Sequence, residues 1–336
     1  MLQIRNRTRF AATLYSSPDP AGVDTLFAVV KGTFTLGARV EEAEEQTPIV
    51  MADRFFGDAR KTSVAEPGDV SLAKPGTDVL LLGHAYGPGG RTATRAEVSL
   101  RLGAIEKRVA VFGDRQWGGT VLTRLSVPKP FDRMPLVWER AFGGADASGN
   151  PSRPDAEDRN PVGTGFRSRA SGRKLEDVVP PNLEDPAHLV SSPGERPAPA
   201  GFGPIAAHWK PRPNYAGTYD AAWQKSRAPY LPDDFDPRFL MVAPEDQQVP
   251  GYLKGGESVE IAGATPSGIL RFGLPARRVD VLFRLDSGEE RRPANLDTVI
   301  LRPDEKKLVL VWRAALPCDK RLLKVREVEP IAARAA

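Results

Sequence analysis

Hydrophobic and polar residues alternate with a period of two in both outer parts of this chain. Residues 95–102 show it most clearly, because the apolar side chains all fall on one face and the residues between them are polar. This pattern is typical of a half-buried strand. Gly103 and Ala104 separate the segment from Ile105–Phe112, which predicts a hairpin whose two-residue turn begins with glycine.

Similar segments predict further strands on both sides of a different middle zone. Before it they are Arg9–Tyr15, Thr25–Leu36, Asp78–Tyr86 and Thr120–Ser126. After it they are Ser258–Ala262, Ile269–Leu274, Arg278–Leu285, Thr298–Leu301, Lys307–Ala314 and Leu322–Val328. We therefore expect a mainly β, antiparallel protein in which residues 1–142 and 257–336 pack as one sandwich- or barrel-like body.

The middle zone, residues 143–256, is rich in proline and glycine but also in aromatic residues. Disordered linkers are poor in aromatic side chains, so we predict an ordered loop region that wraps the body, with few short helices. Burial of these rings would offset the entropy of ordering the loops. Asp220–Ala228 is the best candidate for a short helix, with Asp220 as its N-cap.

Composition and charge exclude several classes. Glycine (31) and proline (32) are too frequent for a helical bundle. Lys and Arg (47) nearly balance Asp and Glu (43), which argues against a nucleic-acid partner. The N-terminal residues carry charges where a signal peptide is apolar, and no apolar run is long enough to span a membrane. We expect a cytoplasmic protein with no membrane partner.

Few residues suggest catalysis, a metal or a cofactor. The three histidines, His84, His188 and His208, are far apart in sequence, and His84 on its apolar strand is expected to have a structural role. Cys318 is the only cysteine, which excludes an intrachain disulfide. The glycines of residues 160–166 lack the flanking strand and helix of a nucleotide-binding loop. We predict no catalytic residue, no metal site and no cofactor.

Acidic residues cluster in the middle zone, and two interpretations remain open. The clusters are Asp155–Asp158, Glu184-Asp185, Asp233–Asp236 and Glu245-Asp246. Such carboxylates most often cap turns and helices in loops rich in proline and glycine. Two of them across a cleft lined by Trp and Tyr would instead suit a glycosidase.

Eight sequence blocks resemble one protein family. They are Lys74–Leu80, Pro135–Gly144, Asn160–Phe166, Pro181–Pro186, Pro199–Ile205, Tyr215–Asp220 with Trp223, Leu231–Phe239 and Ala243–Gln247. Together they resemble the bacterial domain of unknown function 2169, whose members are found beside type VI secretion toxins and spike genes. The blocks lie mainly in the middle zone.

The resemblance implies a non-enzymatic adaptor or chaperone. Its partners would be a secreted toxin effector, which it helps to load onto the secretion spike, and a PAAR-like or spike-tip protein. Aromatic and arginine side chains dominate binding at protein interfaces. The candidate binding residues within the blocks are Arg140, Tyr215, Tyr219, Trp223 and Phe235.

A second function, from another class, also fits the sequence. The acidic and aromatic loops of the middle zone would suit a carbohydrate-active enzyme or a sugar-binding module. A cleft that holds two carboxylates at glycosidase separation would favour the enzyme, whereas an exposed apolar patch would favour the adaptor.

Overall fold

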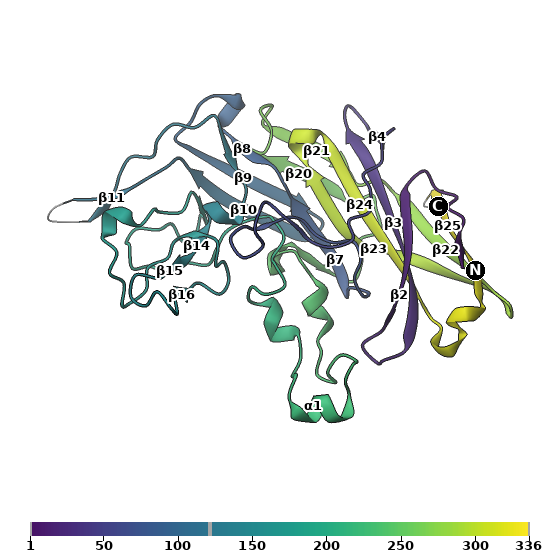
Figure 1. Ribbon diagram of the computed structural model, residues 1–336. Helices are drawn as coiled ribbons and strands as arrows, with labels where there is room; N and C mark the ends of the chain where they lie inside the picture. Colours follow the sequence, from purple (N-terminus) through teal and green to yellow (C-terminus); the bar gives the residue numbers. More distant parts are fainter. Residues whose placement is uncertain (1, 120–122, 335–336) are drawn as a thin grey trace.

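Two β-sheets pack face to face in the computed structural model, which describes residues 2–119 and 123–334. Strands make up 41% of the chain and helical residues 10%, which confirms the mainly β prediction. The larger sheet curls into a nearly closed barrel (Figure 1). Its main path of strands follows the order β1 (Gln3–Ile4), β25 (Val325–Arg334), β22 (Arg277–Leu285), β23 (Gly288–Arg302), β24 (Lys307–Pro317), β3 (Asp24–Leu36) and β2 (Ala11–Pro18).

Three further strands join this sheet off the main path, and a second sheet covers one of its faces. The three are β4 (Val40–Glu42), β7 (Gly76–Leu81) and β19 (Gln248–Pro250). The second sheet has the order β18 (Leu183–Glu184), β10 (Ile105–Phe112), β9 (Arg95–Leu102), β20 (Ser258–Ala262) and β21 (Ile269–Gly273). Val98, Val109 and Ile261 of the second sheet share a core cluster with Val299 and Leu310 of the first.

Strands of two or three residues form five further two-stranded sheets. They pair as β5 (Arg54–Phe55) with β6 (Val64–Glu66), β8 (His84–Tyr86) with β13 (Arg133–Pro135), β11 (Trp117–Gly118) with β12 (Arg124–Leu125), β14 (Phe142–Gly143) with β17 (Thr164–Gly165), and β15 (Ala145–Asp146) with β16 (Asp155–Ala156). The α-helix found in the described ranges is α1 (Ala221–Ser226). Short 3₁₀ turns are η1 (Pro88–Gly90), η2 (Trp138–Arg140), η3 (Leu175–Asp177), η4 (Arg212–Tyr215), η5 (Pro237–Leu240), η6 (Glu245–Gln247), η7 (Pro303–Glu305) and η8 (Asp319–Lys324).

The predicted hairpin and helix cap are confirmed, whereas the predicted strand Leu322–Val328 begins only at Val325, because the residues before it form η8. Leu102 pairs with Ile105 across a two-residue turn in which Gly103 has φ 57°, as the hairpin prediction requires. Asp220 is the N-cap of α1, and its carboxylate accepts a hydrogen bond from the Trp223 amide at 2.8 Å. The predicted strand at Thr120–Ser126 falls partly outside the described residues, and β12 occupies its last part.

The two outer zones interleave in one sheet. β3 pairs antiparallel with β24 along its length, and β7 pairs with β23. The β7–β23 pair is parallel, as is the pair of β1 with β25, so the body is mixed at these two places within a mainly antiparallel fold. Strands from both ends of the chain therefore complete each other's hydrogen bonding.

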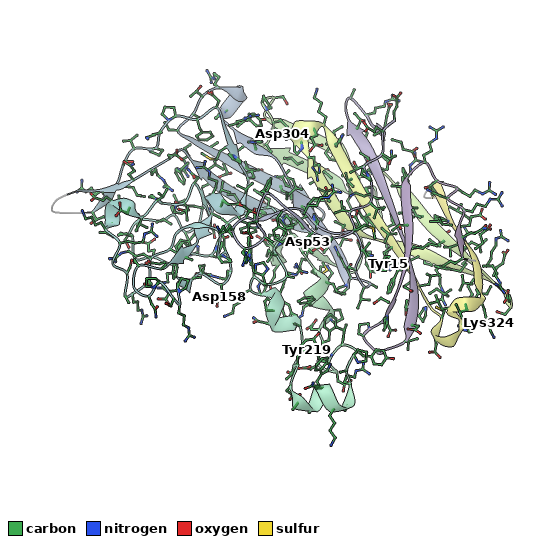
Figure 2. All side chains as sticks on the ribbon, viewed as in Figure 1. Tyr15, Asp53, Asp158, Tyr219, Asp304 and Lys324 are labelled. Carbon is green, nitrogen blue, oxygen red and sulfur yellow. The ribbon has the colours of Figure 1, made fainter. Side chains whose placement is uncertain are left out.

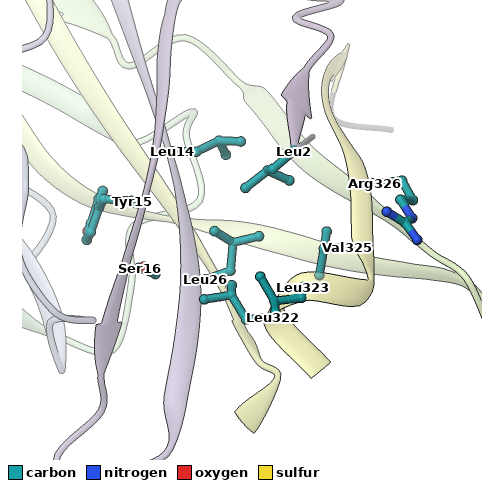
Figure 3. Close-up of a pocket in the computed structure, with 9 residues that line it drawn as sticks. All are labelled: Leu2, Leu14, Tyr15, Ser16, Leu26, Leu322, Leu323, Val325 and Arg326. Carbon is teal, nitrogen blue, oxygen red and sulfur yellow. The ribbon is translucent and has the colours of Figure 1, made fainter. Parts of the chain in front are cut away.

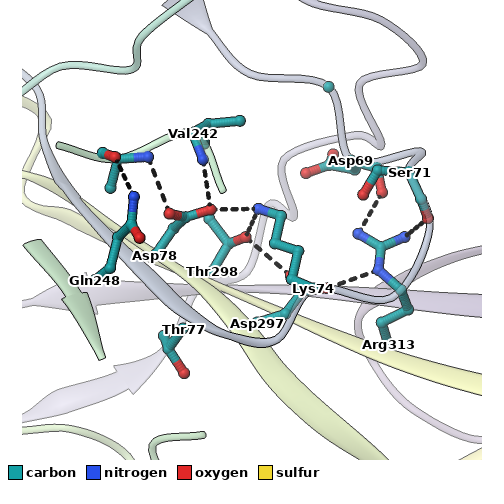
Figure 4. Close-up of polar contacts among 12 residues, drawn as sticks. Asp69, Ser71, Lys74, Thr77, Asp78, Val242, Gln248, Asp297, Thr298 and Arg313 are labelled. Atoms are coloured by element: carbon teal, nitrogen blue, oxygen red, sulfur yellow. Dashed lines mark hydrogen bonds and ion pairs between the residues drawn. The ribbon is translucent and has the colours of Figure 1, made fainter. Parts of the chain in front are cut away.

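Charged side chains inside this body form a continuous network (Figure 4). Arg313 of β24 is buried, and it donates to the Asp297 carboxylate at 2.6 Å and to the Asp69 carbonyl at 2.9 Å. Asp69 accepts from Lys31 at 2.9 Å. Buried charges are tolerated only when they are paired and hydrogen-bonded in this way.

A related pair joins the barrel to the loop region. The Lys74 ammonium lies 2.8 Å from the Asp78 carboxylate, and both side chains are buried. Asp78 also accepts the backbone amides of Val242 at 3.0 Å and Ala243 at 2.9 Å (Figure 4). One carboxylate thus satisfies two loop donors and one cation.

Candidate partner-binding site

Residues 211–240, here called the arm, project from the sheets and carry α1 at their far end (Figure 1). Their root is fixed by Arg212, whose side chain is buried. Its guanidinium donates to the carbonyls of Ile205 at 2.7 Å and Phe239 at 3.0 Å, and it stacks over the Phe239 ring. Both ends of the arm are therefore held to the same point of the body.

The neck of the arm is the part where its outgoing and returning segments contact each other. The Asp236 amide donates to the Tyr215 carbonyl at 3.0 Å, and Arg238 lies over the Tyr215 ring, 4.3 Å from its centre. Asp234 accepts from the amide and hydroxyl of Thr218, at 2.9 and 2.7 Å. These hydrogen bonds lower the pKa of the Asp234 carboxyl, and the one from the Thr218 amide has the largest effect.

The tip of the arm presents aromatic rings to solvent. Tyr219 is 52% exposed and Tyr230 is 40% exposed. Tyr219 and Trp223 meet edge to face, with ring centres 4.8 Å apart, and the Trp223 indole donates to the Tyr230 carbonyl at 2.9 Å. Figure 2 shows Tyr219 on the arm, well away from Tyr15 on the sheet.

The tip is supported from the barrel side. Arg227 donates to the carbonyl of Pro20, in the turn between β2 and β3, and its guanidinium also lies over the Tyr230 ring. With the helix cap at Asp220, these contacts hold the exposed rings in one arrangement. Preordered aromatic side chains lose little entropy when a partner covers them, which makes them effective binding anchors.

Four of the five predicted binding residues lie on the arm, and the fifth does not. Tyr215 and Phe235 are half-buried in the neck, whereas Tyr219 and Trp223 form the tip. Arg140 is in η2, where its guanidinium contacts the side chains of Asp114 at 3.2 Å and Asn182 at 3.1 Å. The structure thus separates Arg140 from the aromatic candidates.

Tyr230 is the exposed aromatic residue of the tip that the sequence did not single out. In the sequence Tyr230 is one of many aromatic residues of the middle zone, and most of the others are at least partly buried. Its exposure depends on the fold of the arm, which alternation and motif spacing do not encode. Trp138 shows the opposite outcome, since it is buried in the core and donates to the Pro204 carbonyl at 3.0 Å.

Over residues 21–313 the chain matches a bacterial family described as an uncharacterized protein conserved in bacteria (DUF2169). The protein belongs to the DUF2169 family. No match to it was found among curated proteins or among solved structures.

The DUF2169 blocks of this chain largely fix its loops to the barrel. Lys74 and Asp78 form the buried pair described above. Asn160 is buried, and its amide donates to the carbonyls of Trp138 at 2.8 Å and Phe142 at 3.0 Å. Gln247 in the last block is also buried, and it donates to the Val79 carbonyl at 2.7 Å. In these blocks, then, polar side chains replace strand pairing as partners for the backbone.

The acidic clusters of this DUF2169 chain have structural partners. Glu184 forms a buried ion pair with Arg115 and accepts the Val190 amide at 2.8 Å. Asp236 caps η5, and Asp234 holds the neck of the arm. The expectation that these carboxylates cap turns and hold loops is confirmed at these positions.

In the cluster Asp155–Asp158, Glu157 pairs with Arg159 and Asp158 with Lys210. The pair Glu245-Asp246 lines a hollow of about 530 Å³ at the root of the arm, together with Trp138 and Lys210. Glu245 accepts the Tyr215 hydroxyl at 3.0 Å, and Asp246 accepts the Lys107 ammonium at 2.8 Å. Burial lowers the pKa of Lys107, while Asp246 acts in the opposite direction. Both carboxylates are thus already engaged by donors of the protein itself.

Other candidate groups are structural as well. His84 is hydrogen-bonded through Nδ1 to Asp304 at 2.8 Å, in agreement with its expected role. Cys318 is buried, and burial raises the pKa of its thiol. Within residues 2–119 and 123–334 there is no group of three His, Cys, Asp or Glu side chains placed to hold a metal ion. The same residues contain no helix that is long and apolar enough to cross a membrane.

A second apolar surface lies at the seam of the barrel. β1 and β2 end the main path of the large sheet, and between them is a hollow of about 510 Å³ (Figure 3). Leu14, Leu26, Leu322 and Val325 line it, and Leu323 at its mouth is 87% exposed. The arm and the seam are separate surfaces on the same body.

Proposed function

We propose that this protein is a non-enzymatic adaptor that binds a secreted toxin effector through the tip of the arm. It would act in the cytoplasm and help to load the effector onto the type VI secretion spike, with a PAAR-like or spike-tip protein as the second partner. No cofactor, nucleic acid or membrane takes part in this function. Membership of the DUF2169 family supports the proposal, because the resemblance implies genes that lie beside those of type VI secretion toxins and spikes.

The observation that carries the proposal is the aromatic group at the end of the arm, in which Tyr219 and Tyr230 are exposed and Trp223 is half-buried. Tyr219, Trp223 and Tyr230 are held by a helix cap, an indole hydrogen bond and the Arg227 contact with the barrel. Fixed Tyr and Trp rings that face solvent are the side chains that most often dominate protein interfaces. The acidic groups, in contrast, are largely taken up by internal hydrogen bonds.

The test is the affinity for the cognate effector, the product of the neighbouring gene. Tyr219→Ala removes an exposed ring and leaves the Trp223–Tyr230 hydrogen bond in place. We expect binding to weaken by about 30-fold, the equivalent of about 2 kcal/mol for an interface anchor. Isothermal titration calorimetry measures this, and a melting curve checks that the variant is folded.

Phe56→Ala is the matched control. Phe56 is 61% exposed on a loop outside the arm, so its removal should leave the affinity unchanged. Equal affinity of wild type, Tyr219→Ala and Phe56→Ala would contradict the arm as the binding surface. Glycoside hydrolysis by the purified protein, abolished by Glu245→Gln, would contradict the adaptor function itself and favour the carbohydrate-active alternative.

A further inference from the structure

A small basic hollow lies in the loop region, outside the arm and the seam. It has a volume of about 400 Å³ and is lined by Arg167, Arg169 and Arg196 with Ser168, Pro193 and Gly194. We propose that this hollow binds the dianionic phosphate group of a phosphomonoester. The proposal does not depend on the adaptor function.

The three guanidinium groups have no carboxylate partner. Within residues 2–119 and 123–334, no carboxylate oxygen lies within 4.0 Å of any of them, whereas Arg108 and Arg326 on the sheets each have a carboxylate at 2.6–2.8 Å. The two nearby acids are already engaged. Asp146 accepts the Ser168 amide at 3.0 Å, and Glu195 accepts the Ser191 amide at 3.1 Å. The three guanidinium groups therefore have no direct ion-pair partner among the described residues and keep donors for a ligand.

Two of the three arginines are fixed in place. The Nε and Nη2 atoms of Arg167 donate to the Arg173 carbonyl at 3.3 and 3.2 Å, which orients its guanidinium and leaves Nη1 for a ligand. Arg196 lies over the ring of buried Phe166, 5.0 Å from its centre. A guanidinium held over an aromatic face in this way keeps its N–H donors available for a planar or tetrahedral oxyanion.

The hollow also has an unsatisfied polar group beside it. Ser168 is only 3% exposed, and its backbone amide is bound by Asp146. Its hydroxyl has no hydrogen-bond partner among the described residues. A buried hydroxyl without a partner is unfavourable, and an incoming ligand oxygen is one group that could satisfy it.

These features select a phosphate group among anions. Guanidinium groups bind carboxylate and phosphate oxygens with paired, charge-assisted hydrogen bonds. Three guanidinium groups without a direct ion-pair partner favour a dianion over a singly charged carboxylate. A hollow of about 400 Å³ exceeds the size of one phosphate ion, so it also accommodates part of the molecule that carries the phosphate. That molecule is either a small phosphomonoester or a phosphorylated side chain of another protein.

The experiment titrates the full-length protein with inorganic phosphate, with O-phosphoserine and with a phosphoserine peptide, followed by calorimetry. We expect saturable binding that weakens as salt rises and, for the two phosphoserine ligands, as the pH falls below the second pKa of the phosphomonoester, about 6. Acetate is the monoanion control. Tighter binding of the peptide than of O-phosphoserine identifies a phosphorylated protein as the source, and equal binding identifies a small phosphomonoester.

Arg169→Gln and Arg196→Gln should each weaken phosphate binding about tenfold or more, because each removes a charge-assisted contact. Arg153→Gln is the matched control, since Arg153 is exposed in the same loop region but does not line the hollow. Arg196→Lys keeps the charge and tests the fork geometry if the glutamine variant fails to fold. Absence of saturable binding, equal binding of acetate, or equal affinity in all variants would overturn the proposal.

Discussion

The barrel and the loop region satisfy their backbones in two different ways. In the barrel, long strands pair over many residues, as β3 does with β24. In residues 143–256 the strands are only two or three residues long, and buried amide side chains such as Asn160 and Gln247 supply partners for the main chain instead. A segment rich in proline and glycine can therefore be ordered when a few polar side chains supply the backbone hydrogen bonds that strand pairing supplies in a sheet.

The arm, although part of residues 143–256, differs from the barrel and from the rest of the loop region, because its tip is held at few points. Arg212 holds its root. Arg227 and the helix cap at Asp220 hold its tip, where the rings are exposed. Stability should therefore depend mainly on the first two regions, and the proposed partner contact on the tip of the arm. Changes in the first two regions should affect unfolding, and changes at the tip should affect binding.

The largest expected effect comes from the link between barrel and loops. Asp78→Ala leaves the Lys74 ammonium buried without its carboxylate and removes the acceptor of two loop amides. We expect a loss of about 3–5 kcal/mol in the free energy of unfolding, the usual effect of breaking a buried ion pair. Urea unfolding followed by fluorescence measures it.

The control for that change is Glu289→Ala. Glu289 pairs with Arg284 on the exposed part of the β22–β23 hairpin. Removing this surface pair should change the stability by about 0–1 kcal/mol. If Asp78→Ala is no more destabilising than Glu289→Ala, the loop region is not held by this carboxylate.

Asn160→Ala should have the next largest effect. It leaves the buried carbonyls of Trp138 and Phe142 without the amide that now binds them. We expect a loss of about 2–3 kcal/mol, measured by chemical denaturation. Asn214→Ala, at an exposed position in η4, should change the stability by less than about 0.5 kcal/mol. Similar values for the two variants would show that side-chain partners do not replace strand pairing here.

The third prediction concerns pH and Asp146. Burial raises the pKa of this carboxyl, but hydrogen bonds from Ser148, Ser171 and Ser168 lower it more, and the balance holds it well below its usual range. Because the folded pKa lies below the unfolded value of about 3.9, the stabilisation is complete at neutral pH and is lost as the pH falls below about 4.

The Asp146→Asn variant tests this directly. It should be less stable than wild type by about 1–3 kcal/mol at pH 7, and the difference should shrink as the pH is lowered from 5 to 3. Denaturant midpoints at each pH provide the measurement. A difference that stays constant over this range would mean that ionisation of Asp146 does not stabilise the loops.

The smallest effect on stability is expected at the tip. Tyr219→Ala removes an exposed ring and one edge-to-face contact with Trp223. We expect the free energy of unfolding to fall by about 0.5–1 kcal/mol, the usual contribution of one aromatic pair. A thermal melt is sufficient, and a loss as large as that of Asp78→Ala would place the tip among the structural elements instead.

Short-range features of the fold could be predicted from the sequence, and long-range ones could not. The hairpin at Gly103 and the cap at Asp220 depend on neighbouring residues alone, and both are confirmed. The predicted strand Asp78–Tyr86 is instead divided, because Gly83 has φ 156° and passes close to the Asp304 carboxylate. Asp304 is more than two hundred residues away along the sequence, so the alternation around Gly83 cannot predict this contact.

Strand length and strand partners show the same limit. β23 was predicted only at Thr298–Leu301, since its first half is polar and largely exposed, yet it pairs with β22 from Gly288 onward. The parallel pairing of β7 with β23 leaves no local pattern either. At the candidate site, residue type indicated the aromatic residues, but only the fold separates the exposed Tyr219 from the buried Trp138.

The interleaving of β7 and β3 with strands from the far end of the chain also sets an order of events during protein synthesis. Thr35 of β3 pairs with Lys307, and Val79 of β7 pairs with Val299. On the ribosome these early strands emerge long before their partners exist, and their apolar residues and open edges stay uncovered meanwhile. The native pairing of β3 and β7 can therefore be completed only after residues beyond 300 have been synthesised, so these strands must avoid aggregation during that delay.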